Sequence, residues 1–229
     1  MKKNDFLIAL VVIVILAPFF IFDSVYENYL SINRQFPLLA AFVKFSILAT
    51  FGEILGKRIK TGNYDLTGFG LLPRAIIWGL LGIWIAIAMS VFRIGVPLFL
   101  NQFSVFAGIA DAMNTTFSGL KLLGAFSISL MMNFSFAPIF MTLHKVTDTH
   151  IAVYNGNIHC LWKPITVQKI LSEINWKVQW GFVFKKTIPF FWIPAHTVTF
   201  ILPQDLQVLF AAICGVALGL ILAVASLKK

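Results

Sequence analysis

Two ionisable residues interrupt an otherwise apolar stretch, residues 36–56, and they are the first candidates for chemistry. Lys44 lies near the middle of this stretch, where an ammonium group in a membrane costs at least about 2.5–3.5 kcal/mol. Glu53 is roughly half a turn out of phase with Lys44 on an α-helix, so the two cannot pair within one straight helix. Glu53 can meet Lys57 one turn later, whereas Lys44 needs another helix, a water-filled cavity or an anionic solute. The alternative is a lysine that snorkels to the interface, which the depth of Lys44 disfavours.

Polar residues in two further apolar stretches extend this set. The carboxamide of Asn133 needs a partner or water at mid-depth in a membrane. His196 lies between Pro194 and Pro203, where carbonyl groups freed at a broken helix can line a cavity, although a histidine satisfied within the core is the plainer interpretation. The candidate pore-lining or gating residues are Lys44, Glu53, Arg74, Asn133 and His196.

Known enzyme and metal-site motifs are absent from the sequence. His144, His150, His159 and Cys160 share one region, but their spacing fits no standard zinc signature. Neither Gly-x-Ser-x-Gly, His-Glu-x-x-His nor a phosphate-binding loop occurs, and the acidic residues show no paired pattern. We therefore expect no catalytic residue, no metal and no cofactor. An intramembrane enzyme that uses Glu53 and His196 is the least favoured hypothesis.

The composition indicates an integral membrane protein. Of the 229 residues 59% are apolar and 12% are charged, and the mean hydropathy is +0.88. A soluble domain typically has about 45–50% apolar and about 25% charged residues, so this excess cannot be hidden in one core. Disordered, collagen-like and disulfide-scaffold classes are excluded by the same figures, and Cys160 and Cys214 imply no bridge.

Six stretches are long and apolar enough to cross a hydrocarbon core, which needs roughly 20 helical residues and at least about 17. They are residues 6–22, 36–56, the stretch between Arg74 and Arg93, the stretch between Lys121 and Lys145, residues 187–204 and residues 206–227. The proline-rich stretch 187–204 either spans fully or is re-entrant. The sequence thus predicts an all-α, polytopic transmembrane helical bundle of about six membrane segments, at least four of them full spans. It forms a single membrane domain, residues 1–229, with 6–22 as a retained N-terminal anchor.

The basic residues are distributed unevenly between the two sides of this arrangement. Fourteen of the 18 lysines and arginines fall on one side, at the two termini, between the second and third spans, and in the loop of residues 144–186. By the positive-inside rule both termini face the cytoplasm or the matrix. We expect a bacterial inner membrane, with the mitochondrial inner or peroxisomal membrane as the alternative. The net charge of +9 therefore indicates orientation and not nucleic-acid binding.

The polar inner loop, residues 144–186, predicts two local structures. Residues 150–162 read as a small β-hairpin around the turn at Asn155 and Gly156. Residues 164–180 have the spacing of a basic amphipathic helix on the inner interface, or of an inward extension of the fifth span.

Small residues recur every fourth position in three of the spans, and such stripes allow helix backbones to approach closely in lipid. Pore lining is the alternative explanation. The predicted helix-packing residues are Gly82, Ala86, Ser129, Gly215 and Gly219.

Four motifs, in the same order, give the chain a family resemblance. They are Gly52-Glu53-Ile54-Leu55-Gly56-Lys57 after Pro37, then Asp65 and Arg74 before Gly79 and Gly82, then Asn133-Phe134-Ser135-Phe136-Ala137-Pro138, and Trp192-Ile193-Pro194-Ala195-His196 with Phe200 and Pro203. Together they resemble elements of the Mpv-type peroxisomal and mitochondrial inner-membrane proteins, the peroxisomal membrane protein family. The resemblance covers about residues 36–226, so that 6–22 is an addition to a family-like core.

The family implies a multi-helix bundle that acts as a channel or pore for small metabolites. We therefore expect a channel-like pathway for small, anionic solutes, lined or gated by the five candidate residues. The alternative is a non-conducting scaffold that docks a partner through the inner loop. The expected partners are the lipid bilayer, a small-molecule solute and, as an open question, further copies of the chain, but no nucleic acid.

Overall fold

The structure is a computed structural model that describes residues 3–227, and in that range the chain forms helices and no strands. The chain divides into two compact units, residues 1–40 and 41–229. The predicted all-α class is confirmed for the described residues.

The first unit contains two helices, α1 (Lys3–Ile21) and α2 (Asp23–Gln35). Helix α1 is the first candidate membrane span, and its window Asn4–Ile21 has a mean hydropathy of 2.5. Phe22 is extended between the helices, and Asp23 lies in the first turn of α2, where a carboxylate is favourable at the positive end of the helix dipole. Helix α2 lies outside the six apolar stretches predicted to be membrane segments, and its mostly polar sequence is not sufficient to predict it.

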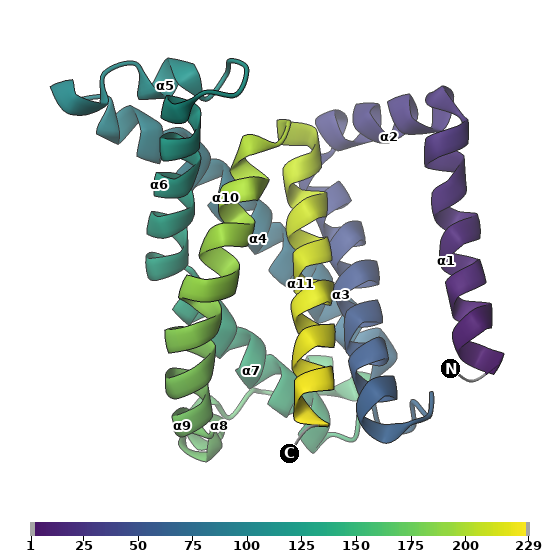
Figure 1. Ribbon diagram of the computed structural model, residues 1–229. Coiled ribbons are helices and arrows are strands. Elements are labelled where there is room, and N and C mark those ends of the chain that lie inside the picture. The colour runs from purple at the N-terminus through teal and green to yellow at the C-terminus, as the bar shows by residue number, and fades with distance from the viewer. Residues whose placement is uncertain (1–2, 228–229) are drawn as a thin grey trace. The chain divides into compact units, whose positions relative to one another are not determined.

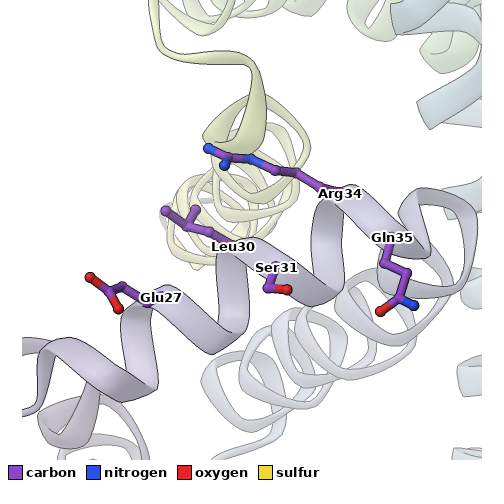
Figure 2. A pocket seen from close by; sticks show the side chains of 5 residues that line it. All are labelled: Glu27, Leu30, Ser31, Arg34 and Gln35. Carbon is purple, nitrogen blue, oxygen red and sulfur yellow. The ribbon is translucent and has the colours of Figure 1, made fainter.

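One face of α2 carries a shallow hollow of about 500 Å³ (Figure 2). Its lining residues all come from α2 and are Glu27, Leu30, Ser31, Arg34 and Gln35.

Three long helices of the second unit pack through glycines. They are α3 (Pro37–Thr61), α4 (Leu71–Leu100) and α11 (Gln204–Ser226) (Figure 1). A Cβ added at Gly82 of α4 would lie 2.5 Å from the Cβ of Phe45 on α3. A Cβ at Gly52 of α3 would lie 3.2 Å from the Cα of Val216 on α11. Without side chains at these glycines the backbones approach closely, as membrane helices do where lipid supplies no hydrophobic force between them.

The next long segment is bent. Helices α6 (Gly119–Ser135) and α7 (Ala137–Val153) meet at Phe136 with an angle of 47°. Pro138 at the start of α7 has no amide hydrogen to continue the ladder of α6, which favours a bend here. Short helices η1 (Ser104–Phe106) and α5 (Ile109–Ala112) connect α4 to α6.

The predicted hairpin of residues 150–162 does not form. Helix α7 continues to Val153, and residues 158–162 form a short 3₁₀ helix, η2 (Ile158–Trp162). Asn155 and Gly156 have φ angles of 50° and 71°, and the amide of Gly156 donates to the carbonyl of Ile151 at 3.0 Å. The Asn-Gly pair therefore closes the C-terminus of a helix, which requires the same positive φ angles as a hairpin turn.

The predicted amphipathic helix 164–180 is interrupted. Helix α8 (Val167–Glu173) ends before Ile174, and α9 (Trp176–Val178) starts a new segment whose first turn is capped by the side chain of Asn175. This segment continues through a π-helical stretch, η3 (Gln179–Trp192), into α10 (Ile193–Ile201). The second half of the predicted helix is thus continuous with residues 187–201, as in the alternative that extends this stretch, and only α8 is separate.

Among residues 3–227, four helices are long and apolar enough to cross a membrane, namely α1, α3, α4 and α11. The bent pair α6–α7 raises this number to up to five if it forms one span. Stretch 187–204 comprises the end of η3, α10 and the break at Leu202, so among the described residues it is not one continuous α-helix of spanning length. Six segments remain a prediction.

Candidate functional site

A cluster of charged side chains joins three of the long helices of the second unit. Nη1 of Arg74, on α4, donates to Oε2 of Glu53, on α3, at 2.8 Å. The same nitrogen also donates to Oδ1 of Asp148, on α7. The Arg74 side chain is only 13% exposed. We call Glu53, Arg74, Asp148 and His144 the charged cluster.

Two aromatic rings complete the surroundings of Glu53. Nε1 of Trp78 donates to its Oε1 at 3.0 Å, and Nε2 of His144 lies 3.4 Å from the same oxygen. The rings of Trp78 and His144 pack with centroids 4.3 Å apart. Lys145 adds a second cation, with its Nζ 3.7 Å from Oδ2 of Asp148. Each carboxylate therefore has a cationic partner, which a buried charge requires.

Two glycines next to the charged cluster, Gly70 and Gly156, are in close contact. Gly70 precedes α4 with a φ of 75°, and it lies against Gly156 at the end of α7. A Cβ added at Gly70 would lie 2.7 Å from the Cα of Gly156, so neither residue tolerates a side chain. This contact brings the start of α4, with Arg74, next to the last turns of α7, with Asp148.

The loop between α3 and α4 adds further contacts to Arg74. Its Nε donates to the carbonyl of Phe69 at 2.7 Å, and its guanidinium lies 4.7 Å from the centre of the Phe69 ring. Asp65 orders the loop, because the Thr67 amide donates to its carboxylate at 2.9 Å. Hydrogen bonding from Thr67 lowers the pKa of Asp65, so this interaction persists at neutral pH.

A second group of polar residues lies between α6 and α10, which run side by side (Figure 1). Nδ2 of Asn133 donates to the carbonyl of Ser129 at 2.9 Å and lies 3.0 Å from Nδ1 of His196. Oγ of Ser129 donates to the carbonyl of Ile193 at 2.8 Å, which ties the two helices together. The His196 ring stacks on Trp192 with centroids 5.0 Å apart. We call Ser129, Asn133, Trp192 and His196 the neutral cluster.

Two polar atoms of the neutral cluster are buried without a hydrogen-bond partner among residues 3–227. They are Oδ1 of Asn133 and Nε1 of Trp192. Asn133 and Ser129 have no exposed surface. An unsatisfied polar group that is buried away from water costs about 1–3 kcal/mol. The neutral cluster contains two such atoms, whereas among the described residues the charged cluster contains none.

Lys44 stands apart from both clusters. It is half-buried on α3, and Asp205 at the start of α11 interacts with it electrostatically. The sequence leaves another helix, a water-filled cavity or an anionic solute as the partner of Lys44, and the structure provides another helix, α11.

The predicted packing residues occupy different environments. Gly82 contacts Phe45, Ala86 is 6% exposed, and Ser129 is fully buried. A Cβ added at Gly215 or Gly219 would meet no described atom within 4 Å. A Cβ added at Gly56 of α3 would lie 3.9 Å from the carbonyl oxygen of Gly219.

The five candidate residues thus fall into three places: Glu53 with Arg74, Asn133 with His196, and Lys44 with Asp205. Sequence reasoning missed Asp148, which lies 74 residues from Arg74 and belongs to no recognisable motif. It also missed Trp78 as a hydrogen-bond donor to Glu53 and Trp192 as the ring stacked on His196. In the described part of the chain, no three His, Cys, Asp or Glu side chains are placed to hold a metal ion.

Comparison with known proteins gives no relative: no family model, no curated protein and no solved structure matches the chain.

Proposed function

We propose that the chain is an integral membrane protein that provides a gated, channel-like pathway for small solutes. The observation that carries the proposal is the charged cluster, in which one guanidinium holds carboxylates from two other apolar helices. Ionisable residues within membrane helices are expensive, and they commonly mark solute or ion pathways.

The charged cluster acts as a latch in this proposal. It lies where α3 ends and α4 begins, at the end that the basic residues assign to the inner side. It connects α3, α4 and α7, so that opening the inner end requires Arg74 to leave at least one carboxylate. Polar interactions of this kind can be exchanged for water or solute, whereas the glycine contacts between α3 and α4 cannot.

The predicted preference for anions has no support from the charges within the helices. Arg74 faces Glu53 and Asp148, and Lys44 faces Asp205. The pathway is therefore proposed for small solutes without a stated charge. The resemblance to the Mpv-type family, which we also propose as the family of this chain, implies the same kind of pathway.

Solute entry into liposomes tests the proposal. The purified full-length chain should carry chloride, nitrate or glycerol across the membrane faster than protein-free liposomes of the same composition do. Asp148→Asn should increase the rate, because Arg74 then keeps only Glu53. Asp111→Asn, an exposed acid on α5, is the matched control and should not change it.

A scaffold that docks a partner is the competing function. It predicts no entry of any of the three solutes above the rate of protein-free liposomes, in the wild type and in Asp148→Asn alike. That outcome would remove the proposed pathway.

A further inference from the structure

We propose that the neutral cluster between α6 and α10 is a binding site for a small uncharged solute rich in hydroxyl groups, such as a polyol. The inference rests on the proposed pathway and specifies which solutes it takes.

The orientation of the Asn133 side chain follows from its partners. The carbonyl oxygen of Ser129 can only accept, so the Asn133 atom 2.9 Å away must be the amide nitrogen. That nitrogen has a second hydrogen, and Nδ1 of His196 lies 3.0 Å from it. Nδ1 therefore accepts, which makes the imidazole neutral with its proton on Nε2.

Three groups of the cluster remain for a ligand. Oδ1 of Asn133 can accept a hydrogen bond, and Nε1 of Trp192 can donate one; both are buried without a partner in the part of the chain that the structure describes. Within the described part of the chain, the one hydrogen bond of the His196 ring is made through Nδ1, so its Nε2–H is a second donor. The cluster thus offers one acceptor and two donors, on residues that contact one another through the Asn133–His196 hydrogen bond and the Trp192–His196 stack. This set matches a hydroxyl-bearing molecule, because each hydroxyl both donates and accepts.

The charge balance of the site excludes ions as the preferred ligand. Ser129, Asn133, Trp192 and neutral His196 carry no charge. An ion in a site of low dielectric constant needs an opposite charge close by. Arg74 is instead paired with Glu53 and Asp148, in the charged cluster.

The backbone that carries Trp192 is π-helical. Trp192 ends the π-helical stretch η3, and His196 follows in α10. Such wide helical turns are rare and occur frequently at functional sites. The Trp192 ring stacks on His196 with 28° between the ring planes, so the two residues that carry the donors are held against each other.

Binding is measured on the full-length chain, labelled with ¹⁵N-histidine, in nanodiscs of phosphatidylethanolamine and phosphatidylglycerol. Glycerol should shift the His196 ring signals in a saturable manner, and nitrate at the same concentration should not. Trp192→Phe keeps the stacked ring and removes only an unpartnered donor, so it should fold as the wild type does. It should weaken glycerol binding about fivefold to tenfold, the value of one hydrogen bond.

Two matched controls separate binding from folding. Trp180→Phe changes an exposed tryptophan in the same helical segment. Thr199→Val removes a buried hydroxyl of α10 that donates to the Ala195 carbonyl of the same helix at 2.9 Å. Both should leave glycerol affinity unchanged.

The outcomes distinguish this site from the pathway itself. A saturable response to nitrate and none to glycerol overturns the inference, and so does glycerol affinity that Trp192→Phe leaves unchanged. Solute entry into liposomes without any saturable effect at His196 also overturns it while the pathway stands. Glycerol binding at His196 without solute entry supports the site and removes the pathway.

Discussion

The charged and neutral clusters solve the same problem in opposite ways. Both place polar side chains where apolar helices meet. In the charged cluster each carboxylate has a cation or an N–H donor within hydrogen-bonding or ion-pair distance. In the neutral cluster Asn133 and Trp192 each keep a polar atom that has no hydrogen-bond partner among the described residues. A closed set of charges is suited to holding helices together, and an open set of neutral groups is suited to binding a molecule.

The largest effect on stability should come from the charged cluster. Arg74→Leu leaves Glu53 and Asp148 close together in a half-buried place without their shared cation. We expect the free energy of unfolding to fall by about 3–5 kcal/mol, because breaking a buried pair strands its charge. Unfolding in mixed detergent micelles measures this, with Arg93→Leu as the control. A loss below about 1 kcal/mol would mean that water already screens these charges.

The glycine contact that supports the charged cluster comes next. Gly156→Ala places a Cβ 2.6 Å from the Cα of Gly70 at a φ of 71°, and should lower the free energy of unfolding by about 1–3 kcal/mol. Gly95→Ala, inside α4 with open space around its Cβ, should instead raise it by up to about 1 kcal/mol. The same sign for both substitutions would contradict this explanation.

The neutral cluster should contribute less to stability than the charged one. Asn133→Leu loses the hydrogen bonds to Ser129 and His196 but also removes an unsatisfied acceptor. We expect a loss of about 1–2 kcal/mol in the same unfolding assay. A loss larger than that of Arg74→Leu would mean that the neutral cluster, and not the charged one, holds the helices together.

The smallest effect is expected at Lys44, which belongs to neither cluster. Lys44→Ala should change stability by less than about 1 kcal/mol, because the side chain is partly exposed. It leaves Asp205 without this cation, so the ratio of potassium to nitrate entry into liposomes should rise about threefold, equivalent to ~0.6 kcal/mol. An unchanged ratio would place Lys44 outside the pathway.

The sequence predicted the long helices and the types of the important residues, and it failed on their pairing. Apolar runs of about 20 residues with few or no charges are sufficient to locate α1, α3, α4 and α11. Glu53 and Arg74 are both candidates from the sequence, but the only partner that the sequence suggests for Glu53 is Lys57, one turn away. Only the tertiary structure shows that α4 and α7 bring Arg74 and Asp148 to it.

The errors around residues 150–180 have a common cause. A positive φ at Asn155 and Gly156 suits a hairpin turn and a helix C-terminus equally well, and the deciding factor is the helical run that precedes it. Similarly, the apolar spacing of 164–180 is continuous across the break at Ile174 and Asn175. Local sequence patterns do not contain the information on where the neighbouring helices end.

The rate of glycerol entry into liposomes that contain either the wild-type chain or Asp148→Asn tests the pathway and its latch together. We predict entry above that of protein-free liposomes for the wild type, and a severalfold faster rate for Asp148→Asn. Equal rates for protein-free, wild-type and Asp148→Asn liposomes would contradict a gated solute pathway.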